Sequence, residues 1–309
     1  MNNKHEKPIL EIKDLSVKFR RYDQGLRQVE LEVISNLSVS VNAGEILAVV
    51  GSSGSGKSLL AHAVLGILPS NAISSGFMSF CGQTLSQQKK EELRGQAIAL
   101  VPQSVTYLDP LMKIGQQVIG VNGTEAAQRQ VFKKYDLKPE TAAMYPFQLS
   151  GGMARRVLVS TAVIGDARLI IADEPTPGLH PAIAEETIKH LRELADEGRA
   201  VMLITHELDL AFKVADKIAV FYGGTTVEVA NVDDFKKGGD ALRHPYSRAL
   251  WEALPENGFK PIPGFQPYAG QLPGGCLFSP RCQERTEECS NYVEMRELRG
   301  GKVRCYHAS

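Results

Sequence analysis

The sequence predicts an α/β protein with a mostly parallel sheet covered by helices, and three observations point to this class. Short apolar strands alternate with helical segments through most of the 309 residues. A glycine-rich loop that begins at Gly51 joins a buried strand to a helix. Seven prolines fall between Pro245 and Pro280, which leaves little room for regular structure there. We therefore expect one α/β core and, from about residue 240, a separate tail that docks on it.

The elements of the core follow from the spacing of apolar residues. Alternating or continuous apolar residues predict strands at 10–19, 33–41, 46–51, 76–81, 97–101, 169–172 and 200–205, and two more between 217 and 229. Helical spacing predicts helices at 57–68, 181–196 and 208–215. The stretch at about 104–165 lacks long β-branched runs. We expect a helical subdomain inserted there, with one helix over 124–135.

Composition narrows the class of protein. Lysine and arginine together number 35, as do aspartate and glutamate, so a net charge of zero gives no sign of a nucleic-acid-binding surface. No apolar run approaches the roughly 18 residues that a membrane-spanning helix needs. The first residues contain no apolar segment typical of a secretory signal. We expect a cytosolic protein whose five cysteines are not paired as disulfides.

A phosphate-binding loop is the strongest local motif. The sequence GSSGSGKS at 51–58 fits G-x-x-x-x-G-K-[ST] between a strand and a helix. Its glycines let successive backbone N–H groups point inward, and the helix N-terminus adds positive potential. We expect Lys57 to reach the β- and γ-phosphates and the Ser58 hydroxyl to bind Mg²⁺. The residues assigned to the nucleotide are Gly51, Ser52, Ser53, Gly54, Ser55, Gly56, Lys57 and Ser58.

Two carboxylates follow a second apolar strand. Asp173 stands at the strand tip, where it can hold Mg²⁺. Glu174 is one step further and points elsewhere, because side chains alternate along a strand. That position suits a general base that polarises an attacking water. A strand that simply ends in solvated acids is the alternative for this motif alone.

A second glycine-rich helix start lies at Ser150, Gly151 and Gly152, within the sequence LSGGM. It is another anion-binding site. In their order and spacing, these motifs resemble the nucleotide-binding subunits of ATP-binding cassette (ABC) transporters over residues 8–237. That family's signature reads LSGGQ, and Met153 stands in place of the glutamine. The resemblance implies a phosphate-loop ATPase core with an antiparallel β subdomain and the helical insertion. It also implies that the signature clamps the γ-phosphate of ATP held by a partner subunit.

The resemblance assigns roles to further residues. Gln103 and His206 are placed like the family's sensors of the γ-phosphate, and Glu174 like its catalytic glutamate. Phe19 is placed like the aromatic residue that stacks on adenine, with Tyr22 a weaker candidate. The implied Mg²⁺ ligands are Ser58, Gln103 and Asp173.

One loop departs from the family pattern. The family usually reads SALD after the catalytic glutamate, but this chain has PGLH at 177–180. The family's aspartate there contacts the opposite subunit. His180 therefore puts symmetric coupling between two subunits in doubt, and it is equally well explained as a surface residue.

The tail at 240–309 is similar to the C-terminal extension of the oligopeptide, dipeptide and nickel branch of ABC importers. The matching sequences are HPYSRAL at 244–250 and GCLFSPRC at 275–282. Four cysteines gather in the tail, at Cys276, Cys282, Cys289 and Cys305. They suggest a metal centre that substitutes for a hydrophobic core. No C-x₂₋₄-C pair typical of structural zinc occurs, and the resemblance leans to a [4Fe–4S] cluster. Zinc and free thiols remain alternatives.

These observations predict an ATPase subunit of a membrane importer, at the cytoplasmic face of the cell membrane. The expected substrates are nickel- or cobalt-type metal chelates, slightly preferred, or small peptides. The expected partners are two permease subunits, a second and non-identical ATPase, and indirectly an extracytoplasmic binding protein, but no nucleic acid. By resemblance, residues 104–116 receive a helix of the permease. The rival functions are a soluble cassette ATPase acting on DNA or ribosomes and a subunit that binds ATP only structurally.

Overall fold

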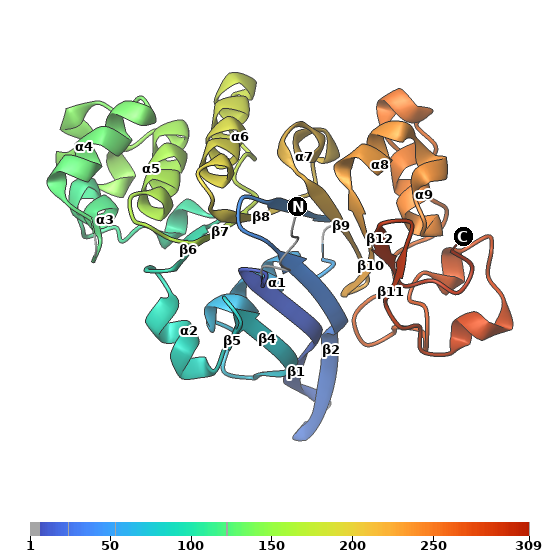
Figure 1. The fold of residues 1–309 in the computed structure, drawn as a ribbon. Helices are drawn as coiled ribbons and strands as arrows, with labels where there is room; N and C mark the ends of the chain where they lie inside the picture. The colour runs from blue at the N-terminus through green and yellow to red at the C-terminus, as the bar shows by residue number, and fades with distance from the viewer. Residues whose placement is uncertain (1–6, 24, 53, 122, 309) are drawn as a thin grey trace.

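An eight-stranded sheet forms the centre of the computed structural model, which describes residues 7–23, 25–52, 54–121 and 123–308 (Figure 1). Its strands are β3 (Ile46–Gly51), β6 (Ile98–Val101), β7 (Leu169–Asp173), β8 (Ala200–Thr205), β9 (Lys217–Tyr222), β10 (Thr225–Asn231), β11 (Arg296–Leu298) and β12 (Gly301–Val303). They are ordered β11-β12-β10-β9-β3-β8-β7-β6. The part from β9 to β6 is parallel, as the sequence predicts, whereas β10, β12 and β11 pair antiparallel at one edge.

A second, antiparallel sheet lies against the first. Its strands are β1 (Leu10–Asp23), β2 (Arg27–Val41), β4 (Ala72–Phe80) and β5 (Gln83–Thr84), in the order β2-β1-β4-β5. This arrangement confirms the antiparallel β subdomain. The long hairpin of β1 and β2 extends beyond the rest of the molecule, as Figure 1 shows.

Alternate residues of the parallel strands face two different cores. The helices involved are α1 (Lys57–Leu65), α5 (Gly151–Val163), α6 (Pro181–Asp196) and α7 (Leu208–Val214). On β8, Val201 and Leu203 pack in one core with residues of α5, α6 and α7. Met202 and Ile204 pack in the other, with α1 and the antiparallel sheet. Burial on both faces explains why these strands are apolar throughout.

The helical subdomain lies at one end of the sheet. It contains α3 (Ile114–Ile119) and α4 (Glu125–Lys134), which pack beside α5 (Figure 1). The Thr124 side chain accepts a hydrogen bond from the Ala127 N–H at 3.1 Å and so caps α4. The helices expected between residues 104 and 165 are therefore present. Two short helices were not predicted, α2 (Gln87–Leu93) and α8 (Val232–Lys237).

The tail docks on the core and also extends the central sheet. It contains α9 (Pro245–Glu252), and its β12 pairs with β10 of the core. The Arg243 side chain is fully buried, with Nη1 3.2 Å from Glu228 Oε1 and Nη2 2.9 Å from Asp234 Oδ2. Because a buried charge is costly without a partner, these two carboxylates fix the start of the tail. The boundaries 8–237 and 240–309 stay a prediction.

Candidate functional site

The phosphate-binding loop is held by close backbone packing. A Cβ added at Gly51 would lie 2.5 Å from the Phe221 carbonyl oxygen, and one at Gly56 would lie 3.1 Å from the Ile34 side chain. Gly54 and Gly56 have φ of 77° and 91°, which favours glycine at both. The loop leads into α1 at Lys57, as predicted. Ser53, also assigned to the nucleotide, lies outside the described residues.

Lys57 is folded back over its own loop. Its Nζ donates to the carbonyl oxygens of Gly51 at 2.8 Å and Ser52 at 3.1 Å. The side chain is 6% exposed, and burial lowers the pKa of Lys57, while Glu174 and Asp173 oppose that shift. The ammonium is thus placed between backbone oxygens and carboxylates, and its predicted contact with the phosphates stays a prediction.

Asp173 and Ser58 form an oxygen pair at the floor of the site. Burial raises the pKa of Asp173, and a hydrogen bond from the Ser58 side chain opposes that rise. Asp173 Oδ1 is buried and has no hydrogen-bond partner among the described residues. A buried carboxylate oxygen that lacks a donor, beside a hydroxyl, is the oxygen set that Mg²⁺ prefers. These two residues therefore fit the expected metal.

Glu174 contacts Gln103 and His206, the two residues predicted to sense the γ-phosphate. Its Oε1 lies 3.1 Å from His206 Nδ1, and its Oε2 accepts a longer contact of 3.5 Å from Gln103 Nε2. Glu174 has φ of 45°, rare for a residue other than glycine, and its N–H donates to the Ile204 carbonyl at 2.9 Å. This backbone conformation departs from that of a regular strand, and the Glu174 carboxylate therefore points toward Gln103 and His206. Residues far apart in the sequence meet here at the carboxyl ends of neighbouring parallel strands.

Arg155 is a site residue that the sequence analysis did not identify. It belongs to α5, the helix that begins at the signature, and is almost fully buried. Its guanidinium donates to the carbonyl oxygens of Pro102 at 2.9 Å, Gln103 at 2.5 Å and Pro177 at 3.4 Å. Arg155 thus joins the signature helix to the Gln103 segment and to the 177–180 loop. An arginine in a signature helix gives no local signal of these contacts.

The signature forms an open helix start. The Ser150 side chain accepts from the Met153 N–H at 3.3 Å and caps α5. A Cβ added at Gly151 or Gly152 would meet nothing within 4 Å. No hydrogen bond among the described residues connects Ser150, Gly151 or Gly152 to the phosphate-binding loop. Their backbone is therefore free to approach an anion from outside this chain.

The two candidate aromatic residues differ in burial. Phe19 lies on β1 opposite Leu31 and Ala72 and is partly buried against the core. Tyr22 is exposed, and its hydroxyl accepts from Gln28 Nε2 at 3.0 Å. The geometry does not decide which of them meets adenine, and the assignment stays a prediction.

The four tail cysteines lie together, and all are free thiols. Burial, and to a smaller degree the other three thiols, raise the pKa of Cys276 to about 11. Burial also raises the pKa of Cys282, with smaller contributions from Cys305 and Cys289, and burial raises the pKa of Cys305, with a smaller contribution from Cys289. Each thiol is therefore near the other three. Cys81 stands apart, half-buried beside the antiparallel sheet.

A histidine lies beside the four tail cysteines, but the described side chains are not arranged to bind a single metal ion. His307 Nε2 lies 3.4 Å from Cys289 Sγ and 2.9 Å from Thr286 Oγ1. Within the described part of the chain, no group of three or more His, Cys, Asp or Glu side chains is arranged to hold one metal ion. The geometry of these residues gives no support to the predicted metal centre, which stays a prediction.

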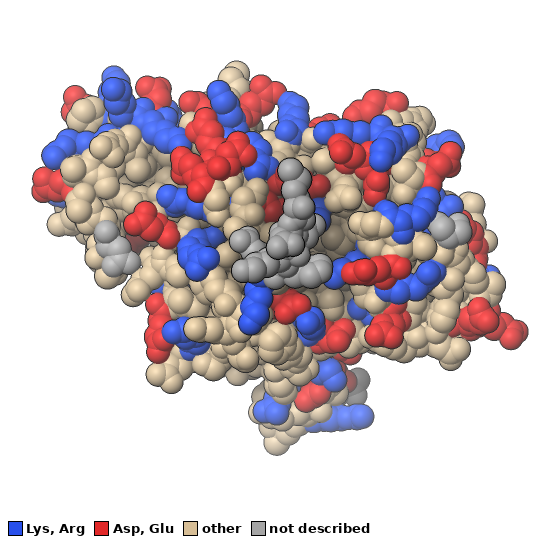
Figure 2. Space-filling model, viewed as in Figure 1, with Lys and Arg blue, Asp and Glu red and all other residues tan. Residues whose placement is uncertain are grey.

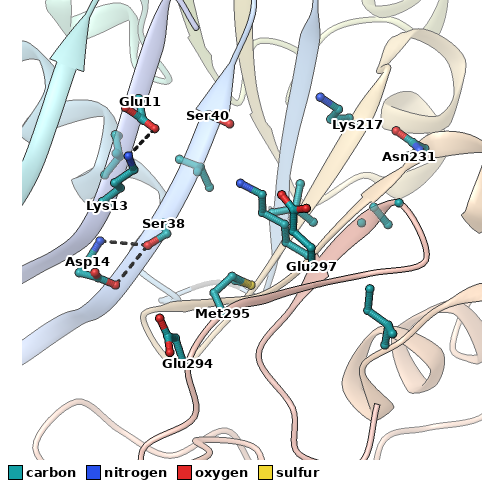
Figure 3. Close-up of a pocket in the computed structure, with 18 of the residues that line it drawn as sticks. Glu11, Lys13, Asp14, Ser38, Ser40, Lys217, Asn231, Glu294, Met295 and Glu297 are labelled. Carbon is teal, nitrogen blue, oxygen red and sulfur yellow. Dashed lines mark hydrogen bonds and ion pairs between the residues drawn. The ribbon is translucent and has the colours of Figure 1, made fainter. Parts of the chain in front are cut away.

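One hollow among the described residues lies away from the phosphate-binding loop. It is a groove of about 990 Å³ between the β1–β2 hairpin and the tail strands (Figure 3). Glu11, Lys13 and Asp14 line one side, and Glu294 and Glu297 line the other. Charges of both signs line it, and none of the predicted nucleotide residues does.

Two protein families match the chain. The family described as ABC transporter matches residues 34–177, and the family described as oligopeptide/dipeptide transporter, C-terminal region, matches residues 227–289. The chain is 34% identical over 325 residues to the oligopeptide transport ATP-binding protein OppD of Haemophilus influenzae, covering 96% of each chain. It is 34% identical over 305 residues to the dipeptide transport ATP-binding protein DppD of Escherichia coli, covering 91% of this chain and 90% of that one.

Solved structures agree with the fold. The ATP-binding cassette MJ0796, in a dimeric post-hydrolysis state bound to ADP and Pi, matches with a TM-score of 0.62 and 22% identity, over 72% of this chain and 98% of that chain. A structure titled ATP binding subunit of ABC transporter matches with a TM-score of 0.61 and 24% identity, over 74% and 92%. At these identities the matches support the architecture alone.

Proposed function

Because this chain belongs to the ABC transporter ATP-binding subunits, in the branch that carries the oligopeptide/dipeptide C-terminal region, we propose that it hydrolyses ATP to drive the uptake of small peptides. Relatives are named for oligopeptide, dipeptide and peptide import. These names favour peptides over the nickel- or cobalt-type chelates, which find no support among them. The observation that carries the proposal is the meeting of Glu174 with His206 and Gln103 beside the phosphate-binding loop.

The side chains divide the work of ATP hydrolysis. The backbone of the phosphate-binding loop and Lys57 bind the phosphates, while Ser58 and Asp173 hold the magnesium ion. When bound, that ion neutralises charge on the β- and γ-phosphates. Glu174 accepts a proton from the attacking water, and His206 keeps the carboxylate oriented through its 3.1 Å contact. Gln103, whose Nε2 lies 3.5 Å from Glu174 Oε2, acts as a sensor of the γ-phosphate.

A second cassette completes the site. The open backbone at Gly151 and Gly152 leaves an anion-binding helix start without a ligand from its own chain. We assign it to ATP held by a partner ATPase, so that ATP joins the two subunits and hydrolysis releases them. The PGLH loop at 177–180, which departs from the family's usual sequence, favours a non-identical partner.

The segment at 104–116 offers a surface for a permease. It exposes apolar side chains beside the Gln103 segment, with Tyr107 54% and Leu111 87% exposed, and Val105 and Met112 also exposed. Exposed apolar side chains gathered in one segment mark a protein contact. The described part of the chain contains no helix long and apolar enough to cross a bilayer. Because the relatives are named as transport ATP-binding proteins, we place the chain at the cytoplasmic face of the membrane, on two permease subunits fed by an extracytoplasmic binding protein.

The rival role on DNA or ribosomes has less support. The net charge is zero, and Figure 2 shows acidic and basic side chains interspersed over the face in view. A nucleic-acid-binding surface would be expected to gather basic residues. The other rival, a subunit that binds ATP without hydrolysing it, is opposed by the presence of both Lys57 and Glu174 in the sequence.

For the four thiols we propose a [4Fe–4S] cluster, with zinc as the alternative. Buried thiols with raised pKa values stay protonated unless a cationic centre binds them as thiolates. Ligands about 2.3 Å from one zinc ion would crowd around that ion. The described thiols are close to one another without forming such a single-ion group. A [4Fe–4S] cluster takes four cysteine ligands, one on each iron, and the tail supplies four cysteines.

The importer is tested by purifying the complex in detergent through a tag on this chain and identifying its partners by mass spectrometry. We expect two multi-span proteins and a second cassette ATPase, and uptake of labelled peptide by vesicles that contain the complex. Recovery of soluble partners, DNA or ribosomes alone would contradict the proposal. Uptake of nickel chelate but not peptide would overturn the substrate.

The thiol centre is tested by anaerobic purification followed by iron, sulfide and zinc analysis. We expect equal iron and sulfide, lost in Cys276→Ser and retained in Cys81→Ser, whose thiol lies apart from the group. Zinc in place of iron would support the alternative. Protein without metal, whose four tail thiols all react with a thiol reagent, would contradict both.

A further inference from the structure

The tail reaches the phosphate-binding loop at Ser52. The Ser52 hydroxyl donates to Oε1 of Gln266, a residue 214 positions later in the chain. The Tyr246 hydroxyl also lies near the Ser52 side chain, which opposes the rise of the Tyr246 pKa that burial causes. A serine hydroxyl has one donor and two acceptor positions, so Ser52 can donate to Gln266 and still accept from the Tyr246 hydroxyl. Two residues of the tail therefore converge on one side chain of the loop.

Tyr246 is firmly placed for this contact. It is buried in α9, and its ring centroid lies 4.5 Å from that of Tyr222 and 5.3 Å from that of Phe278. Tyr222 ends β9, the strand that flanks β3 just before the loop. The Tyr246 N–H donates to His244 Nδ1 at 3.0 Å, which fixes the first turn of α9. The hydroxyl thus projects from a rigid aromatic group.

Gln266 is held between two anchors of an otherwise irregular segment. Before it, Arg281 donates to the carbonyl oxygens of Pro263 at 2.7 Å and Ile262 at 2.9 Å. After it, the backbone of Gly270 approaches Leu31 of β2 so closely that an added Cβ would lie 2.8 Å away. A surface glutamine on a free loop would not stay at one serine, whereas these anchors keep Gln266 there.

We propose that Tyr246 and Gln266 are positioning residues for ATP, which fix the phosphate-binding loop through the Ser52 side chain. The Ser52 carbonyl oxygen accepts from Lys57 Nζ at 3.1 Å and from the Ser55 N–H at 3.3 Å. Ser52 therefore contacts the tail through its side chain, and through its carbonyl oxygen it also fixes Lys57 and the turn of the loop. The inference rests on the proposed nucleotide site and adds the tail to it.

The test is equilibrium binding of Mg-ATP to the full chain, measured by calorimetry, together with kcat and KM of the assembled complex. Tyr246→Phe keeps the packed ring and loses the hydroxyl, and Gln266→Ala loses the acceptor. We expect each to raise the Kd and KM for ATP roughly two- to tenfold, as befits one hydrogen bond, with kcat nearly unchanged. The matched controls Tyr268→Phe and Gln271→Ala, exposed in the same segment, should bind like the parent.

A double-variant cycle separates positioning from general stability. In a Ser52→Ala background, Tyr246→Phe and Gln266→Ala should weaken ATP binding no further, because the atom through which they act is gone. An undiminished effect in that background, parent-like binding in both single variants, or tighter binding would overturn the inference. Lys57→Ala serves as the reference. If it also binds ATP like the parent, the proposed nucleotide site itself is wrong, whereas loss of binding in Lys57→Ala alone rejects only the role of the tail.

Discussion

The two glycine-rich helix starts of this chain meet opposite surroundings. The phosphate-binding loop is packed so tightly that a methyl group at Gly51 would strike the Phe221 carbonyl oxygen, whereas one at Gly151 would meet nothing. Both starts offer backbone N–H groups to an anion. One is completed by residues of its own chain, including the tail, and the other is left open. Under the proposed function, the same chemistry serves once as a site within the chain and once as a surface for a partner.

Among the tests of this comparison, the largest expected effect is that of Gly151→Ala on ATP turnover by the assembled complex. We expect ATP turnover to fall roughly 100-fold, because a methyl group would keep the partner's phosphate from the backbone N–H groups. ATP binding to the isolated chain should not change. Gly165→Ala, at an equally open position beyond the end of α5, is the control for turnover. Parent-like turnover in Gly151→Ala would mean that the open loop faces no phosphate.

Arg155→Lys tests the physical link from the signature helix to the Gln103 segment and the 177–180 loop. Arg155 donates to three backbone carbonyls near Gln103 and Pro177, and lysine cannot reproduce that planar fork. We expect kcat to fall about tenfold with little change in ATP affinity, the size of one or two charged hydrogen bonds. A rise in KM without loss of kcat would show that Arg155 supports binding instead. Arg129→Lys, on exposed α4, is the matched control.

Stability should distinguish the same two glycines. Gly51→Ala is expected to lower the free energy of unfolding by about 1–3 kcal/mol, because the backbone of β9 must move away from the new methyl group. Gly151→Ala should change it by no more than about 0.5 kcal/mol. Chemical denaturation of the isolated chain measures both values. Equal losses would remove the distinction between a packed and an open loop.

The smallest expected effect is a pH dependence of the free energy of unfolding, caused by His244 in the tail. Burial, and to a smaller degree Arg248, lower the pKa of His244 from 6.5 to about 3. The folded state therefore favours neutral His244, so its contribution to stability is present above pH 6.5 and is lost as the pH falls from 6.5 toward 3. His244→Asn keeps an acceptor for the Tyr246 N–H but does not titrate. The parent should lose about 1 kcal/mol more stability than this variant over the first pH unit below 6.5. Parallel stability curves would contradict the assignment.

Much of the site was predictable because its signals are local. The loop at 51–58, Asp173 and Glu174, and the signature at 150–152 each lie within a few residues of a strand end or a helix start, and such ends of parallel strands meet at one edge of a sheet. The contact of Glu174 with Gln103 and His206 follows from that rule.

The contacts that the sequence could not predict are long-range. Gln266 meets Ser52 across 214 residues, and nothing in a proline-rich stretch marks the one glutamine that turns inward. The position of Arg155 in α5 predicts only that it is buried. The backbone carbonyls that accept from its guanidinium lie in other segments and cannot be identified from the sequence. The strands β11 and β12 have three residues each, too short to carry a period-two pattern.

The most direct test of the account compares ATP binding and ATP turnover in the complex that carries Glu174→Gln. The substitution keeps the size of the side chain and its contact with His206 but removes the proton acceptor. We predict that turnover falls by roughly 10²- to 10⁴-fold while Mg-ATP still binds with parent affinity. Turnover at the parent rate would contradict the assignment of Glu174 as the base, and with it the site assembled around the phosphate-binding loop.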